Sequence, residues 1–374
     1  MMQDVKINSY QFLVLVIFFT VGTTMLTIPS VIAVGAKQDA WVSTIFGTVI
    51  GLIVIWLFCT LAEWFPQLTF IQIIDKLCGK WIGKLVSLLF VSMPFLYTSI
   101  LLNYSGTFLN IHAMPSTPIV ALNILMGIVI VMGVRLGLET IARSAEILIV
   151  VFFVLFLILV VFISPEIKFE NIQPIYEAGT KKIVQSSLNF VVTSTVNAVI
   201  LLMIFPAFVN KTKQGKKSFL IGNLIGGIII IIITFLSVAV LGTGNTTRQM
   251  YPVYELAKLI NVGDFVQRIE ALMATLWIIA LYFKATLYFY ASVLGIAQIF
   301  NLKDYRPLTL PLGMIAIALS LVIYPNVIYR QNWDSTTGNS LSILIGLFLP
   351  LLLVVVYAIR KKQLKKEACM PNKL

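Results

Sequence analysis

A lysine inside an apolar run is the first residue of this sequence that could do chemistry. Lys284 lies about ten residues or more from either end of its run, which would place its backbone about 15 Å or more from each face of a membrane. An ionisable group at that depth is a candidate for ligand binding or ion coupling. The alternative is a structural lysine that is permanently paired with backbone carbonyls or with a carboxylate of another segment.

Two polar interruptions of apolar runs indicate a place where a small molecule could bind. Each interruption is followed by a proline, Pro29 in the first run and Pro206 in the sixth. The residues that we expect to bind ligand are Gly22, Thr23, Thr24 and Met25 in the first run and Thr193, Ser194, Thr195 and Asn197 in the sixth. Glycine and proline weaken or remove helical hydrogen bonds, and hydrocarbon leaves the freed backbone groups unsatisfied. We therefore expect residues 22–25 to be non-helical and to line a cavity together with residues 193–197. The alternative for the first run is a proline-kinked helix whose threonines bond to their own backbone.

Such breaks could bind the two charges of an amino acid. The free N–H groups and the positive dipole end of the half-helix after Gly22 would receive a carboxylate, and carbonyls freed at the end of the half-helix before Thr193 would receive an ammonium. Tyr97 and Tyr104 are seven residues apart and share a helical face, with Asn103 and Ser105 beside it. A phenol on that face could hold the ligand carboxylate, although a packing or interface role is the alternative.

The remaining reactive residues exclude several kinds of site. His112 is the single histidine, and the three cysteines, Cys59, Cys78 and Cys369, have no metal-binding or disulfide spacing. No phosphate-binding glycine motif or catalytic arrangement is present, so we expect no metal, no cofactor and no enzyme activity. The net charge of +12 comes from short loops and a tail, which argues against a nucleic-acid partner.

Composition indicates an all-α polytopic membrane protein. Hydrophobic residues make up 59% of the 374 and charged residues 11%, with a mean hydropathy of +0.98. We expect one transmembrane domain, residues 1–359, and a basic cytoplasmic tail, residues 360–374. The ten apolar runs are 10–34, 41–62, 85–109, 118–137, 141–163, 184–208, 218–241, 268–297, 307–325 and 340–359. Most lysines and arginines fall in loops on the side of the two termini, so both termini are expected in the cytoplasm.

Two connecting segments have an amphipathic pattern. Residues 69–84 space apolar positions at three and four with lysines between them, which predicts a cytoplasmic interfacial helix. Residues 251–262 predict a similar helix on the outer side. The basic tail is expected to contact anionic lipid.

The two halves of the chain are alike in their interrupted segments. Runs one to five, residues 10–163, and runs six to ten, residues 184–359, each begin with a broken segment. Interrupted segments at corresponding positions predict an inverted-repeat transporter fold with discontinuous helices 1 and 6 and a ligand site at mid-membrane.

Several motifs carry a resemblance to a known family. They are Gly22-Thr23-Thr24-Met25-Leu26-Thr27-Ile28-Pro29, Met203-Ile204-Phe205-Pro206, Tyr251-Pro252, Arg268-Ile269-Glu270-Ala271-Leu272 with Trp277, and the Lys211 to Lys217 loop. Along its whole length the chain resembles the B subunits of spore nutrient-germinant receptors, the GerAB family. That family is similar to amino acid–polyamine–organocation transporters, which implies a LeuT-like fold of five plus five helices.

The resemblance implies a function and partners. It implies a subunit of the spore inner membrane that recognises a small nutrient, often an amino acid, together with an A subunit and a lipoprotein C subunit. In LeuT-like proteins the eighth span lies against the first, where sodium-coupled members bind their ion, so by this resemblance Lys284 could substitute for sodium, with a structural lysine as the alternative. The sequence departs from many transporters in lacking a second glycine at the first break and an aromatic-glycine motif in the sixth run.

Three functions remain open at the level of sequence. The first is nutrient sensing as a germinant-receptor subunit, the second is proton-coupled amino-acid uptake, and the third is a ligand-gated ion or water pore. One fold can serve all three, because a transporter that no longer moves substrate can keep its whole site.

Overall fold

The computed structural model describes residues 6–259 and 270–369, and this part of the chain is helical, without a β-sheet. The predicted all-α polytopic class is confirmed. The α-helices are α1 Ser9–Val21, α2 Thr24–Ala36, α3 Ala40–Trp64, α4 Phe70–Cys78, α5 Lys80–His112, α6 Ile119–Leu136, α7 Leu138–Ile163, α8 Gly179–Ser194, α9 Thr212–Arg248, α10 Pro252–Lys258, α11 Glu270–Ile299, α12 Arg306–Val322, α13 Val327–Trp333, α14 Asn339–Ile343 and α15 Leu349–Cys369.

The apolar helices account for the expected crossings. Eight segments of the described chain are long and apolar enough to span a membrane, and Ser9–Val21 and Arg306–Val322 are shorter apolar helices. One of the eight, Thr24–Trp64, includes both α2 and α3, so α1 and α2 together form the broken first span. The division into repeats 10–163 and 184–359 stays a prediction.

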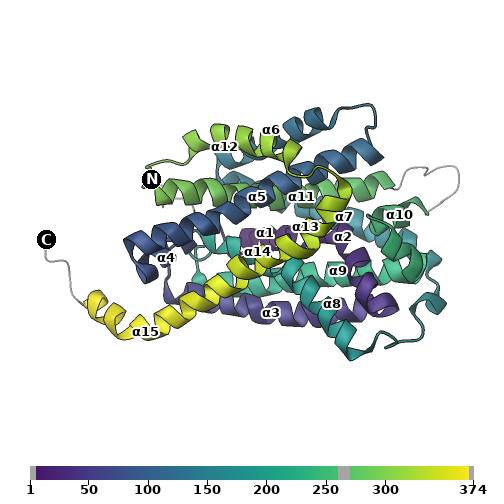
Figure 1. Ribbon diagram of the computed structural model, residues 1–374, viewed down its shortest axis with the longest axis horizontal. Helices are drawn as coiled ribbons and strands as arrows, with labels where there is room; N and C mark the ends of the chain where they lie inside the picture. The colour runs from purple at the N-terminus through teal and green to yellow at the C-terminus, as the bar shows by residue number, and fades with distance from the viewer. Residues whose placement is uncertain (1–5, 260–269, 370–374) are drawn as a thin grey trace.

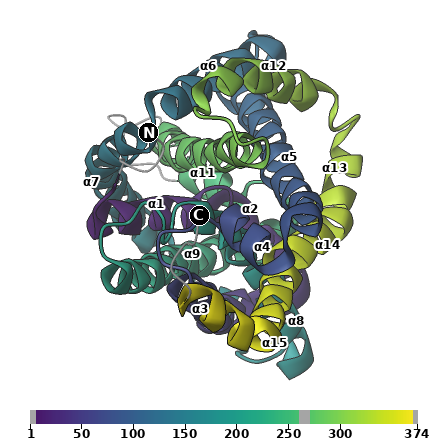
Figure 2. The ribbon, with the colours of Figure 1, turned by 90° about the vertical axis from the view of Figure 1, so that its left-hand side faces the viewer.

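The broken first span lies at the centre of the bundle. Ten of the thirteen residues of α1 are buried, and α1 packs against α7, α9 and α11 while α2 packs against α8 and α9. Viewed along the bundle, α6 and α12 lie together on one side and α3 and α15 on the opposite side (Figure 2). Because protein surrounds α1 and α2, a break between them exposes little backbone to lipid.

The loops segregate to two ends of the bundle (Figure 1). At one end lie α4, the parallel bridge between Ile7 and Val209, and the ion pair of Lys216 Nζ with Glu63 Oε2 at 3.0 Å. At the other end lie α10 and the loop before α8, where the Asp39 carboxylate accepts hydrogen bonds from the Tyr176 and Ala178 N–H groups at 2.7 and 3.0 Å. The loops expected on the side of the termini therefore share one end.

The amphipathic segments are shorter than expected. The predicted helix over 69–84 is wrong in length, because Gly79 adopts φ 83° and separates α4 from α5. Five of the nine residues of α4 are buried, so the apolar face of this helix packs against the end of the bundle. The segment 251–262 contains α10, and its last three residues, like Arg268, lie outside the described residues.

Small residues set how closely the helices approach. A Cβ added to Gly222 would lie 2.8 Å from Val16 Cβ, and one added to Gly226 would lie 2.7 Å from Thr20 Cβ. Both glycines are on α9 and face α1. Two glycines four residues apart on one helix allow a neighbouring helix to approach this closely.

Candidate functional site

The first break occurs at Gly22 and Thr23, as predicted. Helix α1 ends at Val21, Gly22 has φ 7° and ψ −114°, and its N–H bonds to Phe18 O at 2.9 Å. The expectation that Thr24 and Met25 are non-helical is wrong, because Thr23 already has helical angles and α2 begins at Thr24. The break is thus two residues long, and the first N–H groups of α2 begin next to it.

The sixth run breaks later than expected. Helix α8 continues through Thr193 and Ser194, whose hydroxyls donate to Asn189 O and Phe190 O at 2.9 and 2.8 Å. Hydroxyls that bond to their own helix need no break. After Thr195 the chain forms the 3₁₀ helix Val196–Met203, so the discontinuity of this span is a change of helix type.

Lys284 lies against the first break, as the resemblance implied. Its Nζ donates to Thr23 Oγ1 at 3.1 Å and lies 5.2 Å from the centre of the Phe19 ring, and only 2% of the residue is exposed. A Cβ added to Gly22 would lie 2.3 Å from Lys284 Cδ, so glycine leaves room for the lysine stem. Within the described chain, no carboxylate oxygen lies within 4.0 Å of this amine.

A cavity of about 490 Å³ extends from this break toward the end of the bundle that carries α10. Six of the expected site residues line it: Thr23, Tyr97, Tyr104, Thr193, Asn197 and Lys284. The other five are buried away from its wall: Gly22, Thr24, Met25, Ser194 and Thr195. A volume of this size is typical of sites for small molecules.

The two tyrosines line the cavity, but their hydroxyls already have partners in the last span. Tyr97 donates to Gly338 O at 3.0 Å and shares a hydrogen bond with Ser342 Oγ at 2.7 Å, and Tyr104 donates to Asp334. Asn103, on the neighbouring face, donates instead to Ser320 O at 2.9 Å. The tyrosines therefore join α5 to the last span, and a direct ligand contact by either phenol stays a prediction.

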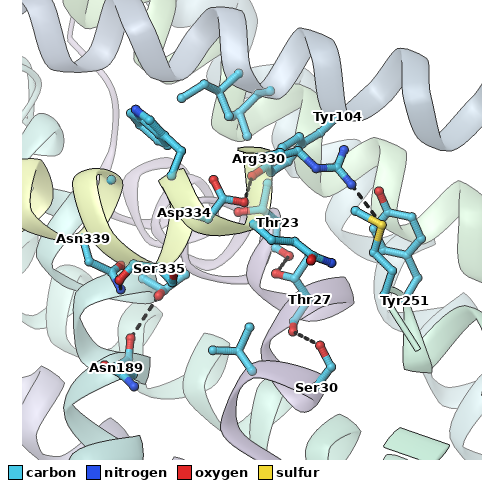
Figure 3. A pocket seen from close by; sticks show the side chains of 18 of the residues that line it. Thr23, Thr27, Ser30, Tyr104, Asn189, Tyr251, Arg330, Asp334, Ser335 and Asn339 are labelled. Carbon is cyan, nitrogen blue, oxygen red and sulfur yellow. Dashed lines mark hydrogen bonds between the residues drawn. The ribbon is translucent and has the colours of Figure 1, made fainter. Parts of the chain in front are cut away.

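Sequence reasoning missed the part of the site that precedes the tenth apolar run. Arg330 and Asp334 lie one helical turn apart on α13 and on the π-helical stretch Asp334–Gly338 that follows it, and both line the cavity (Figure 3). Hydropathy placed the start of this span at residue 340 because residues 330–339 are largely polar. Polar residues spaced at a helical period directly before an apolar run were the available signal.

Several buried polar atoms on the wall have no hydrogen-bond partner among the described residues. They are Asn197 Oδ1, Trp277 Nε1 and Tyr288 Oη. Burial raises the pKa of Tyr251, which lies between α9 and α10, and a hydrogen bond with the Arg330 guanidinium opposes that increase. Unpaired buried polar groups are uncommon, and on a cavity wall they are places where a ligand or water can bond.

Comparison with known proteins assigns this chain to a family. A family profile described as "Spore germination protein" matches residues 6–328. The chain belongs to the spore germination protein family. The expected resemblance is confirmed, and the chain is 28% identical over 98% of both lengths to spore germination protein KB of Bacillus subtilis (strain 168).

Solved structures show the fold of this spore germination protein. MhsT in complex with L-phenylalanine is 15% identical with a TM-score of 0.69, covering 95% of this chain and 99% of MhsT. The nucleobase-cation-symport transporter Mhp1 is 12% identical with a TM-score of 0.69, covering 96% of this chain and 80% of Mhp1. The LeuT-like fold is thereby confirmed, and the family and these neighbours are permeases and transporters, not enzymes.

Proposed function

We propose that this chain is the nutrient-binding B subunit of a spore germination receptor and that it binds an amino acid in the cavity beside the two broken helices. The observation that supports this most strongly is the cavity itself, which the breaks of the first and sixth spans and Lys284 all border. The proposed setting is the spore inner membrane, with both termini cytoplasmic and with an A-type subunit and a lipoprotein C-type subunit as partners.

The cavity offers separate places for the two charges of an amino acid. The positive dipole end of α2 and the Lys284 amine both lie at Thr23, which favours a carboxylate there. The unpaired Oδ1 of Asn197 and the negative end of α8 favour an ammonium. These contacts support a zwitterionic ligand.

Binding of amino acids to the purified full-length chain tests this function. We expect at least one of the common L-amino acids to raise the thermal unfolding temperature, because a ligand that binds only the folded state stabilises it. Asn197→Leu should abolish that increase, whereas Asn110→Leu, outside the cavity, should keep it. An unfolding temperature that none of the amino acids changes would contradict the proposal.

Proton-coupled uptake is the second candidate, and a ligand-gated pore is the third. The LeuT-like fold and a buried amine at the first break favour uptake over the pore. Accumulation of labelled amino acid in proteoliposomes under a proton gradient would establish uptake, and ligand-dependent ion or water flux would establish a pore. Copurification with an A-type subunit, without accumulation or flux, is the result expected of a sensor.

A further inference from the structure

The mouth of the cavity holds a second buried cation. Arg330 is 3% exposed although it lies near the end of the bundle, and it belongs to the cavity wall. One of its nitrogens contacts Met250 Sδ at 2.9 Å, and its guanidinium lies 5.1 Å from the centre of the Tyr104 ring (Figure 3). A thioether is a weak acceptor, whereas a guanidinium has five N–H donors.

The neighbouring carboxylate does not satisfy this arginine. Asp334 accepts hydrogen bonds from Tyr104 and from Tyr324, the latter at 3.2 Å. Within the described chain, neither Asp334 nor another carboxylate comes within 4.0 Å of the Arg330 guanidinium. Asp334 is near enough to interact with Arg330 electrostatically but is not in direct contact with it. A buried guanidinium without an anion in direct contact keeps donors to spare, and a carboxylate in a two-point contact is the partner that it binds best.

The charges along the wall are unequal. The described wall has three cations, Arg248, Lys284 and Arg330, and one carboxylate, that of Asp334. Lys284 lies at the inner break and Arg330 near the mouth, so the two buried cations border different parts of one cavity. A cavity with apolar surroundings and an excess of positive charge concentrates anions.

We propose that Arg330 binds a second carboxylate of the ligand and that the cavity therefore selects acidic amino acids. The α-carboxylate would lie at Thr23 and Lys284, and the side-chain carboxylate would lie at Arg330. This inference rests on the amino-acid function proposed above and adds the class of amino acid.

Pairs of ligands that differ by one charge test it. With the full-length chain in lipid nanodiscs, binding of L-glutamate is compared with L-glutamine and binding of L-aspartate with L-asparagine. We expect at least one acid to bind at least about tenfold more tightly than its amide, because hydrogen bonds to charged groups are worth more than neutral ones. Arg330→Gln should remove this preference, because it should weaken binding of the acid at least about tenfold more than binding of the amide.

Two further variants keep the test decisive. Arg143→Gln removes an exposed arginine that pairs with Glu139, and the preference for acids should persist in it. If Arg330→Gln does not accumulate, Arg330→Lys should weaken binding of the acid more than binding of the amide, because an ammonium cannot make the two-point contact.

Different results would contradict the role of Arg330 and the amino-acid function. Three results would overturn the role of Arg330 and leave the amino-acid function standing. The amides could bind as tightly as their acids, the preference for acids could survive in Arg330→Gln, or that preference could be undiminished in Arg330→Lys. No binding by any common amino acid would overturn the proposed function and this inference with it.

Discussion

Lys284 combines a buried amine with a hydroxyl partner and an aromatic ring. Its hydrogen bond is to Thr23, and the described chain provides no carboxylate within 4.0 Å. A substitution that removes the amine therefore leaves no carboxylate stranded. The structural alternative, a permanent ion pair, would leave an unpaired charge at a cost of several kcal/mol.

We accordingly predict that Lys284→Met reaches the membrane at normal abundance, because methionine keeps much of the apolar stem. The response to ligand should be lost or become independent of ligand, which is the result expected if the amine biases the equilibrium between two conformations. Quantitative immunoblotting of membranes beside a germination or transport assay measures both. Depletion of the variant from the membrane would contradict the coupling role.

Gly22 provides a second prediction for the same contact. We expect Gly22→Ala to reduce thermal stability by about 1–3 kcal/mol, because its Cβ would overlap the stem of Lys284. The loss should be smaller in a Lys284→Ala background, since that change removes Cδ, the atom that would lie 2.3 Å from the added Cβ. Gly244→Ala is the matched control, because a Cβ there meets nothing within 4 Å. Equal losses in both backgrounds would show that the close approach to Lys284 is not the cause.

The last span is supported by contacts from elsewhere in the chain. Its π-helical stretches, Asp334–Gly338 and Leu344–Phe348, flank α14, and Tyr97 bonds to both Gly338 and Ser342. A π-helical stretch is seldom stable without such support and is frequent at functional sites. The phenol of α5 thus helps to hold the backbone that carries Asp334 on the cavity wall.

Removing that phenol should loosen the last span. We predict that Tyr97→Phe lowers stability by about 1–2 kcal/mol, because buried Ser342 and Gly338 O lose a hydrogen bond. Tyr10→Phe, at a tyrosine that is 55% exposed, is the control. Hydrogen exchange should rise in residues 334–343 of the Tyr97→Phe variant. Unchanged exchange there would mean that the π-helical stretch holds its shape without Tyr97.

How well each helix break could be predicted depends on whether local residues or packing determine it. Gly22 and Pro29 act on their own backbone, so the sequence was sufficient to predict the first break to within two residues. The sixth break was misplaced because the hydroxyls of Thr193 and Ser194 can bond either to a ligand or to their own helix, and the choice depends on packing. Arg330 and Asp334 were missed because a membrane segment that is polar on its cavity side has too low a hydropathy to be recognised as a span.

At the scale of the whole molecule, α9 holds the first span in place. It packs against α1, α2 and α3, and Gly222 and Gly226 allow α1 to approach closely. The fold class could be predicted because it depends on average hydropathy. Which helices touch, and hence which predicted residues face one cavity, depends on these close approaches and was only partly accessible from sequence.

We predict that Gly226→Leu prevents normal assembly, because no adjustment of Thr20 makes room for four added carbon atoms between α9 and α1. Membrane abundance should fall severely, and no ligand should restore it. Gly244→Leu, in an open position of the same helix, should accumulate normally. Normal abundance of Gly226→Leu would mean that the helices can separate without loss of the fold.

The contact between Lys284 and the first break also bears on energy supply. A sodium ion that binds beside a broken helix can leave on the other side of the membrane, and its departure lets a carrier draw work from the sodium gradient. An amine that is covalently fixed to α11 cannot leave, so no sodium gradient can be drawn on at that place. If Lys284 takes the place of a coupling sodium ion, ligand would not be accumulated at the expense of sodium, and we expect the response to ligand to be the same in sodium and potassium media.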